Sequence, residues 1–464
     1  MKKKKKLPIQ SIAILLGLTI ILPIIVWSLP KIQEWRKAAA GKPADIIIDT
    51  ARPGGIIKAD LWQNFSQGGE EAKDMLAPVI SEVADLKPKL IRIDHLFDHH
   101  VKVNGNQYDF SQLDNAVNSI LQTGAKPMLS LSYMPQSLSK DNNVTSEPKD
   151  WSSWRKLVVA AVSRYSGKNG LNIDGVYYEV WNEPDLFGNW HYGREKNYLN
   201  LYQQTLTAVQ GLSNVNSFKI GGPATTGFYP NWIKALLSFC HQKQLRIDFV
   251  SWHRYTENIP DYSQDFEKLN RILTDYPEFF SIERIITEFG PDSENSPWYD
   301  QQIGAIHSLS AVISLIGKVH RIFTFEIKDG PDPAGNLYWG RWGLLTHESK
   351  GVVKKPRYFA YQFLNQIDGL PRLPLDGEGT WVSAIAVKDG AKIKILAVNY
   401  DPKEKNYQSV PITLKNLVPG DYQVKTNYFM GRETIVNETI NENSVTRSLI
   451  LPPNSAAIIE WIKI

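Results

Sequence analysis

The sequence predicts an α/β protein: a (β/α)8 TIM barrel followed by a C-terminal β-sandwich and preceded by an N-terminal transmembrane anchor. Eight short apolar runs alternate with amphipathic stretches of helical period between residues 56 and 369. Closely spaced strand-like runs separated by turns follow from residue 371. An apolar, uncharged run at residues 7–30 follows five lysines. A chain of 464 residues is also too long for one compact core, so more than one folding unit is expected.

The predicted barrel strands share a high content of β-branched and aromatic residues. They are 56–66, 90–97, 127–135, 175–184, 218–225, 247–255, 284–290 and 321–329. Most of the segments between them have helical period, as 150–165 and 232–244 do. An open doubly wound sheet is the alternative, but no glycine-rich dinucleotide loop follows the first run. Eight strand and helix units therefore favour a closed barrel over residues 44–370.

The C-terminal segment, residues 371–464, has the pattern of a small antiparallel domain. Two alternating runs flank Asp389-Gly390, a pair typical of a tight hairpin. Four further short runs with turns between them complete a β-sandwich. Residues 44–50, ADIIIDT, have no helix partner and are a candidate additional strand of this sandwich.

The N-terminal residues 1–43 are read as a cytoplasmic lysine run, an anchor and a linker. The run at 7–30 is about long enough to cross a hydrocarbon core of roughly 30 Å as a helix. The lysines should stay in the cytoplasm, which places the globular part outside it. Cleavage of a signal peptide near the small residues 38–44 is the alternative, and it would give a secreted protein.

The charge pattern argues against a nucleic-acid partner. Residues 1–42 hold nine Lys and Arg against the single acid Glu34, a net +8, so the rest of the chain carries −4 although the total is +4. The single cysteine, Cys240, cannot form a disulfide within the chain and is expected in the core. No cofactor is predicted, and the oligomeric state is left open.

Two glutamates stand where predicted strands end. Glu183 follows the fourth run and Glu288 follows the seventh. These strands lie opposite one another in a barrel, and the C-terminal strand ends form the mouth where chemistry is found. Carboxyl groups about 5–5.5 Å apart suit retaining glycoside hydrolysis, and about 6.5–9.5 Å suits inversion. A single Glu at a strand end is more often a solvated surface group, but two on opposed strands favour a catalytic pair.

Polar neighbours accompany this pair. Asn182 precedes Glu183, while His253 and Tyr255 end the sixth run. Such groups supply hydrogen bonds that tune a carboxylate or hold a sugar hydroxyl. Arg92 on the second run points toward the mouth and is expected to pair with Glu288. Together with Asn182 or Tyr255, it should keep Glu288 ionised.

The motifs resemble those of a known family. WNEP at 181–184 and TEFG at 287–290 are similar to the signatures of clan A glycoside hydrolases. The segments 177–190, 248–255 and 285–290 most resemble glycoside hydrolase family 39, which includes β-xylosidases, α-L-iduronidases and bacterial exopolysaccharide hydrolases. SYMPQSL at 132–138 and the segment 343–361 also resemble it, so the likeness covers roughly residues 56–464.

The resemblance implies roles for particular residues. It implies Glu183 as acid/base, Glu288 as nucleophile, and Asn182 as a hydrogen-bond donor to the sugar 2-hydroxyl. His253 and Tyr255 would shape the site, and no metal or cofactor is required. Many members of the clan carry a Trp on strand eight, whereas this chain offers Phe323 or Phe325. The remaining candidates for substrate contact are Arg92, Asp94, His95, Tyr133, Trp190, Trp298, Trp339, Trp342 and Glu326.

Two of these groups have a structural alternative. Glu326 is an unusual acid for strand eight and suits an ion pair with a Lys or Arg equally well. Asp94, His95, His99 and His100 have metal-like spacing, but a closed ligand set is not evident, and no metal is predicted. Aromatic residues in polar loops, Trp190 among them, are read as platforms for sugar rings.

The predicted function is retaining hydrolysis of glycosidic bonds in an extracellular or cell-envelope polysaccharide or oligosaccharide. A non-catalytic carbohydrate-binding barrel is the first alternative, although both carboxylates are present. A transglycosidase, which uses the same covalent intermediate, is the second. The sugar, its linkage and the choice between exo and endo action are left open.

Overall fold

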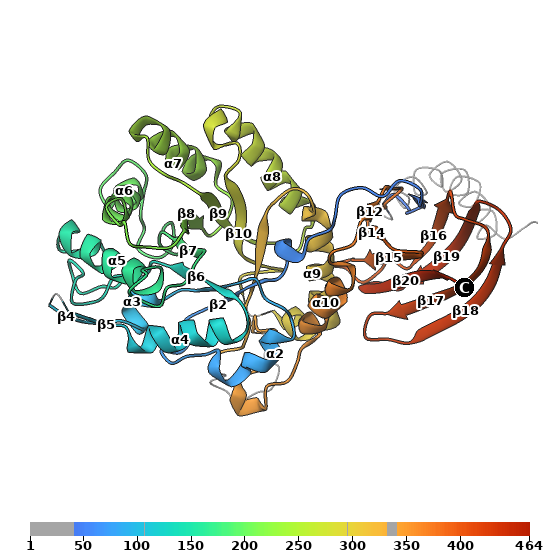
Figure 1. Cartoon of the computed structure of the whole chain (residues 1–464), viewed down its shortest axis with the longest axis horizontal. Coiled ribbons are helices and arrows are strands. Elements are labelled where there is room, and N and C mark those ends of the chain that lie inside the picture. The colour runs from blue at the N-terminus through green and yellow to red at the C-terminus, as the bar shows by residue number, and fades with distance from the viewer. Residues whose placement is uncertain (1–40, 106, 295, 332–340) are drawn as a thin grey trace, which may run out of the picture.

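The computed structural model describes residues 41–105, 107–294, 296–331 and 341–464. The barrel and the sandwich stand side by side, with α9 (Gln302–Leu315) and α10 (Pro356–Leu364) between them (Figure 1). The predicted anchor at residues 7–30 lies outside the described residues. Within the described ranges, none of the helices is both long enough and apolar enough to span a bilayer.

The barrel is closed and its eight strands are parallel, in the order β10-β11-β2-β3-β6-β7-β8-β9. Each of the eight predicted runs supplies one strand, so the predicted barrel is confirmed. The strands are β2 (Asn64–Gln67), β3 (Leu90–Ile93), β6 (Lys126–Ser130), β7 (Val176–Glu179), β8 (Phe218–Thr225), β9 (Phe249–Tyr255), β10 (Glu283–Gly290) and β11 (Arg321–Phe325).

Helices follow most of the strands and cover the outside of the barrel. Their N-termini explain where they begin: Asp150 and Asn197 accept hydrogen bonds from the first turns of two helices, and proline opens three others. The remaining helices are α2 (Ile80–Ala84), α3 (Leu96–His99), α4 (Ser111–Gln122), α5 (Trp151–Tyr165), α6 (Tyr198–Val209), α7 (Pro230–Lys243) and α8 (Pro260–Leu273). A small hairpin, β4 (Lys102–Asn104) and β5 (Gln107–Asp109), precedes α4.

Short 3₁₀ helices fill several of the connections. They are η1 (Ala59–Leu61), η2 (Ala77–Val79), η3 (Pro277–Phe279), η4 (Pro297–Asp300), η5 (Glu348–Lys350) and η6 (Asn365–Ile367).

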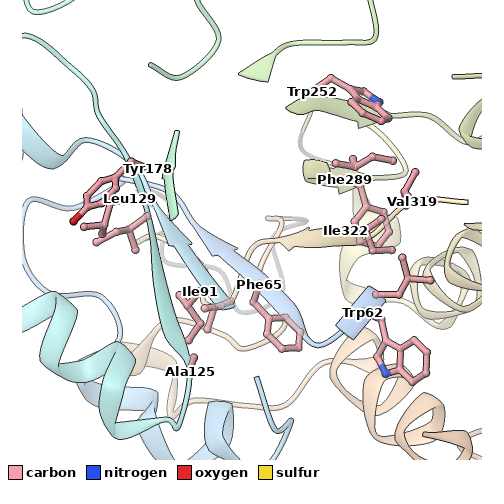
Figure 2. Close-up of a cluster of buried hydrophobic side chains, with 14 of the residues drawn as sticks. Trp62, Phe65, Ile91, Ala125, Leu129, Tyr178, Trp252, Phe289, Val319 and Ile322 are labelled. Carbon is pink, nitrogen blue, oxygen red and sulfur yellow. The ribbon is translucent and has the colours of Figure 1, made fainter. Parts of the chain in front are cut away.

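Alternation along the strands separates two apolar layers. One set of buried side chains fills the barrel interior below the mouth: Leu90, Met128, Tyr177, Phe249, Ile285 and Phe323. Their strand neighbours, such as Ile91, Leu129, Tyr178 and Ile322, point outward and pack in the larger cluster beneath the helices (Figure 2). Because the period of a strand is two, residues two positions beyond the interior set point into the barrel at its mouth.

Several predicted strands are shorter than expected, the first and the fourth most of all. Most of 56–66 is not a strand, because η1 occupies its centre. Asp368 Oδ1 accepts a hydrogen bond from the backbone N–H of Ala59, the first residue of η1. The Asn64 side-chain amide donates to the carbonyl oxygens of Asp60 and Leu61. In the fourth run the strand ends at Glu179. The chain then takes left-handed backbone angles at Trp181 and Glu183, which a strand cannot accommodate.

The C-terminal domain is the predicted β-sandwich. Its four-stranded sheet has the order β13-β1-β16-β19 and its six-stranded sheet β12-β14-β15-β20-β17-β18. The strands are β1 (Ile46–Asp49), β12 (Arg372–Leu373), β13 (Leu375–Asp376), β14 (Val382–Asp389), β15 (Lys392–Asn399), β16 (Gln408–Lys415), β17 (Gly420–Tyr428), β18 (Glu433–Ile440), β19 (Ser444–Leu451) and β20 (Ser455–Lys463). Because β1 pairs with β16 and β13, the segment 44–50 belongs to the sandwich and not to the barrel range 44–370.

The six-stranded sheet packs on both faces. On β14, Ala384 and Ala386 face the other sheet, whereas Ile385 and Val387 join the apolar cluster of the barrel. Strands β15 and β20 alternate in the same way. Helix α9, which lies between the barrel and this sheet, is buried along almost its whole length. The sandwich is therefore fixed against the barrel by a continuous apolar core.

Candidate active site

A cavity of about 800 Å³ opens at the C-terminal ends of the barrel strands. Both candidate catalytic glutamates line it, together with side chains from several βα loops. The lining residues are Gly68, Gly69, Glu70, Asp94, His95, Tyr133, Asn182, Glu183, Asp185, Leu186, Phe187, Thr226, Tyr229, Tyr255, Glu288, Ser293, Glu294, Phe325, Arg341 and Trp342. A concave, largely preformed site of this size suits a sugar-sized ligand.

A β-bulge aims Glu288 into the cavity. Ile285 faces the barrel interior and Ile286 faces outward, so strict alternation would turn Glu288 away from the interior. The register of β10 shifts against β9 between Ile286 and Glu288, which sets Glu288 opposite His253. Phe289 then returns to the outer apolar layer. One extra residue in the strand thus places the carboxylate at the mouth.

Glu183 reaches the cavity from a strained loop. It lies four residues beyond the end of β7 with φ at 45°, in the left-handed region that non-glycine residues rarely adopt. Its backbone N–H donates to the carbonyl of Ala224, itself at φ 52°, where β8 shifts register against β9. Such strain clusters at functional sites, where the surrounding structure holds it in place.

The two carboxylates face each other across His253. The Nδ1 atom of His253 lies 2.8 Å from Glu183 Oε1 and 3.3 Å from Glu288 Oε2. One carboxylate oxygen of Glu183, one of Glu288 and one ring nitrogen of His253 all lie within 4.8 Å of one another. Such a close approach of the two carboxylates agrees with the short class of carboxyl pairs that retaining enzymes use.

Arg92 is the centre of a buried hydrogen-bond network. Its Nη1 donates to Glu288 Oε1 at 2.8 Å, its Nε to Glu179 Oε2 at 2.7 Å, and its Nη2 to Asn182 Oδ1 at 2.7 Å. The predicted pairing of Arg92 with Glu288 is therefore present. Because both the arginine and Glu179 are fully buried, the network fixes the arginine in one orientation.

Of the two further donors offered for Glu288, Asn182 and Tyr255, Asn182 does not contact it. Its Oδ1 accepts from Arg92, and its Nδ2 donates to the hydroxyl of Tyr133 at 2.8 Å. Instead, the Tyr255 hydroxyl donates to Glu288 Oε2 at 2.8 Å. Glu288 thus receives hydrogen bonds from Arg92 and Tyr255, and the Asn182 side chain is held beside it at the cavity wall.

Burial works against ionisation of Glu288. It raises the pKa of Glu288 to about 7, even though His253 and Arg92 favour the charged form. Burial alone would lower the pKa of His253, but the carboxylates of Glu288 and Glu183 outweigh it and raise that pKa. The expected donors thus favour the ionised form of Glu288, but burial outweighs them and keeps its pKa above the ordinary value.

A polar wall beside Glu288 carries Asp94, His95 and Tyr133, as predicted for a substrate pocket. Asp94 is 6% exposed, and its Oδ1 has no hydrogen-bond partner among the described residues. His95 Nδ1 lies 2.8 Å from Asp98 Oδ2; burial opposes the charge, but Asp98 and Asp94 raise the pKa of His95 to about 9. The wall therefore presents a hydrogen-bond acceptor at Asp94 and a cationic ring at His95.

Two clusters of side chains that could bind a metal lie outside the catalytic pair, but their members already form ion pairs. His95, Asp98 and His99 bring ligand atoms within 4.8 Å, as do Glu71, His347 and Glu348. In the first cluster, His95 and Asp98 already form an ion pair. In the second, two lysines pair with the two carboxylates. The predicted absence of a metal stays a prediction.

Glu326 forms neither of its predicted contacts. It is fully buried, does not line the cavity, and pairs with no Lys or Arg within hydrogen-bond distance among the described residues. Its Oε2 accepts from Gln67 Nε2 at 2.9 Å and from the Gly68 backbone at 3.3 Å. Burial, followed by the carboxyl of Glu70, raises the pKa of Glu326 well above its usual value. Glu70, whose carboxyl contributes to this shift, is the member of the carboxyl pair that faces the cavity.

The four candidate tryptophans have different positions. Trp342 lines the cavity, with the Arg341 guanidinium 4.1 Å above its ring and Phe325 5.6 Å away. Trp190 is 1% exposed and packs on Trp181 in the core, so it offers no face to a sugar. Trp298 is half-buried against the same core and does not line the cavity, and Trp339 lies outside the described residues.

The strand-eight position is also settled by the structure. Phe325 lines the cavity, whereas Phe323 belongs to the packed barrel interior below it. Of the two phenylalanines offered on strand eight, Phe325 is therefore the one that faces the cavity.

Several cavity residues were not found by sequence reasoning. Glu179 could have been predicted from strand periodicity, because it lies two positions after the inward-facing Tyr177 and so faces the barrel interior as well. Glu70, Phe187, Tyr229 and Arg341 lie on loops whose course depends on tertiary structure. No periodicity in the sequence distinguishes them.

Comparison with known proteins agrees with this geometry. A β-xylosidase from Geobacillus stearothermophilus is 29% identical over 312 residues, which are 60% of this chain and 60% of that protein. A β-xylosidase from Caldicellulosiruptor saccharolyticus is 26% identical over 340 residues, covering 67% of this chain and 66% of that protein. The matches thus cover less than two thirds of the length of these relatives.

Solved structures share the whole architecture. A monomeric β-xylosidase from Caulobacter crescentus CB15 superposes with a TM-score of 0.75 over 91% of this chain and 100% of that one, at 20% identity. A GH39 enzyme from Xanthomonas axonopodis pv. citri superposes with a TM-score of 0.73 over 91% of this chain and 98% of that one, also at 20% identity. At this identity the likeness shows the fold. The family model described as glycosyl hydrolases family 39 matches residues 84–416, most of the chain, and the protein belongs to that family.

Proposed function

We propose that the protein is a retaining glycoside hydrolase in which Glu288 is the nucleophile and Glu183 the acid/base. The observation that carries the proposal is the short separation of the two carboxylates: an oxygen of each lies within 4.8 Å, and both line one cavity at the barrel mouth. Membership of the family supports the same chemistry. A non-catalytic binding protein has no need for this arrangement.

The first step forms a glycosyl ester. Glu288 attacks the anomeric carbon as the bond to the leaving oxygen breaks, and Glu183 donates its proton to that oxygen. Arg92 and Tyr255 hold the attacking carboxylate by hydrogen bonds from two sides, which fixes its direction of approach. In the second step Glu183 takes a proton from water, the water oxygen attacks the anomeric carbon, and the ester bond to Glu288 breaks.

We propose a β-xyloside as the substrate, because both relatives are named β-xylosidases. Phe325 and Trp342 give the cavity an apolar wall, and Asp94 and Asn182 offer an acceptor and an amide for ring hydroxyls. This combination of aromatic faces and a few fixed polar groups is what carbohydrate sites use.

We further propose that the protein acts outside the cytoplasm, held to the membrane by residues 7–30. The support is the apolar length of that run and the lysines before it. The full-length protein should remain with membranes after a carbonate wash. Recovery of mature protein starting near Gly41 from the soluble exported fraction would support secretion after cleavage instead.

The experiment that tests the activity is a screen of the purified protein against aryl glycosides, aryl β-D-xyloside first, followed by proton NMR of the first product formed. We expect hydrolysis with the anomeric configuration of the product the same as that of the substrate. No hydrolysis of any glycoside, or release of the opposite anomer, would contradict the proposal.

A further inference from the structure

The loop that carries Glu183 continues into an aromatic surface that the catalytic step does not use. Leu186 and Phe187, on this loop, are 56% and 39% exposed and line the cavity. Tyr229, which precedes α7, is 43% exposed and lines it too. A soluble chain gains nothing in stability from gathering such side chains at one rim.

A second hollow adjoins this rim. It measures about 330 Å³ and is lined by Asp185, Tyr192, Tyr229, Pro230, Asn231 and Trp232. Asp185 and Tyr229 line both hollows, so the second continues the first. We call the exposed aromatic residues Tyr192 and Tyr229, with Trp232 behind them, the aromatic shelf.

The shelf is held in a fixed shape. The backbone N–H of Thr226 donates to Asp185 Oδ1 at 3.1 Å and its hydroxyl to Asp185 Oδ2 at 2.5 Å, which ties the loop after β7 to the loop after β8. The Tyr229 hydroxyl lies 3.0 Å from the Thr226 hydroxyl. The Tyr192 and Trp232 rings meet edge to face at 5.3 Å between centroids. A preformed surface loses little conformational freedom when a ligand binds.

The position of Glu183 decides which part of a substrate meets the shelf. A general acid must lie within hydrogen-bond reach of the oxygen that it protonates, and that oxygen belongs to the leaving group. Asp185, two residues after Glu183, lines both the cavity and the hollow that holds the shelf, whereas Glu288, Asp94 and His95 line only the cavity. Whatever contacts the shelf is therefore attached to the departing oxygen.

We propose that the aromatic shelf binds the leaving-group side of the substrate, and that this leaving group is an oligosaccharide of two or more sugar rings. Flat aromatic faces pack against the C–H faces of sugars, and the nearby Asp185 and Asn231 side chains can bond their hydroxyls. The inference rests on the proposed function and deepens it. It implies that the enzyme cleaves oligosaccharide chains in preference to small glycosides.

The kinetic test compares two substrates that share the sugar to be cleaved. In xylotetraose the leaving group is a chain of three sugar rings, whereas in an aryl β-D-xyloside it is a single small ring. In Tyr229→Ala and Tyr192→Ala proteins, the ratio of kcat/KM for xylotetraose to kcat/KM for the aryl xyloside should fall about tenfold per variant. Tyr407→Ala, which removes a tyrosine that is 73% exposed on the sandwich, is the matched control and should keep the wild-type ratio.

Equal losses on both substrates, or an unchanged ratio in both shelf variants, would overturn the inference while leaving the activity established. If wild-type protein hydrolyses no xyloside, the proposed function has failed, and a binding measurement decides the shelf by itself. Calorimetry should then show that xylotetraose binds the Glu288→Gln protein. The double variant, which carries Tyr229→Ala as well, should bind it about tenfold more weakly. No binding to Glu288→Gln protein, or equal affinity in the double variant, would overturn the inference.

Discussion

The end of β10 and the loop after β7 carry the two catalytic carboxylates in contrasting surroundings. Glu288 sits on a strand, 7% exposed, with hydrogen bonds from Arg92 and Tyr255. Glu183 sits on a strained loop, 13% exposed, with His253 as its close partner, and leads into the aromatic shelf. One carboxylate is fixed and surrounded by donors, and the other borders the open part of the cavity.

This difference matches the two chemical roles. A nucleophile must approach one carbon atom along one line, so hydrogen bonds from two sides favour catalysis there. An acid/base must reach the leaving oxygen first and a water afterwards, so a carboxylate beside open space is required. The surroundings thus support the proposed roles independently of the motifs.

Removal of the nucleophile should have the largest effect. Glu288→Gln cannot form the ester, so kcat should fall by roughly 10⁴-fold or more for activated and unactivated substrates alike. Steady-state rates on an aryl xyloside and on xylobiose measure this, and circular dichroism controls for folding. Activity above about a tenth of wild type on either substrate would end the assignment.

Removal of the acid/base should sharpen the contrast, because its effect depends on the leaving group. Glu183→Gln should slow xylobiose by about 10²–10⁴-fold and a dinitrophenyl xyloside far less, since that phenolate departs without a proton. Added azide should restore the second step by attacking the ester in place of water. Equal losses on both substrates, without rescue, would mean that Glu183 has another role.

The pH profile reports on the burial of Glu288. Because burial raises the pKa of Glu288 to about 7 and the ionised form attacks, kcat/KM should fall about tenfold per pH unit below that value. Tyr255→Phe removes a donor to the carboxylate, so it should move the acid limb to higher pH. A profile flat down to pH 5 in the wild-type protein would show that the carboxylate is already ionised.

The smallest effect is expected at a third carboxyl, Glu326, which accepts hydrogen bonds from Gln67 and Gly68 but from no charged donor among the described residues. The pKa of Glu326 is raised above the ordinary 4.5, so its stabilising contribution is complete at low pH and is lost as the pH rises above about 4.5. Glu326→Gln keeps a neutral hydrogen-bonding group. The wild-type free energy of unfolding should therefore fall relative to that of the variant as the pH rises from 5 to 8. Denaturant titrations at several pH values check this, and parallel curves would contradict it.

Alternation along the strands did not predict the β-bulge that aims Glu288 or the left-handed loop that carries Glu183. Strand periodicity, together with the gathering of strand ends, did predict the barrel, the sandwich hairpin and the meeting of Glu183 with Glu288. These features follow from local pattern and from the rule that parallel strand ends gather at one mouth. Arg92 was predictable for the same reason, since it lies two positions after the inward-facing Leu90.

Features set by loops were not predictable. Trp190 stands among polar residues in the sequence, yet its backbone N–H donates to the Pro184 carbonyl at 2.8 Å and the loop folds its ring onto Trp181. Glu326 was expected to meet a cation or a sugar, but the loop after β2 brings Glu70 to it instead. Both outcomes depend on tertiary contacts that no periodic pattern encodes.

The central claim, that Glu288 forms a covalent bond to the sugar, is tested most directly by trapping that bond. A 2-deoxy-2-fluoro β-xyloside with a dinitrophenyl leaving group slows the second step more than the first, so the ester accumulates. Peptide mass spectrometry should find one fluoroxylosyl group on Glu288 in the wild-type protein, and in Glu183→Gln as well. A label on Glu183, or turnover of an unmodified xyloside with no label and with inversion of the anomeric centre, would contradict the account.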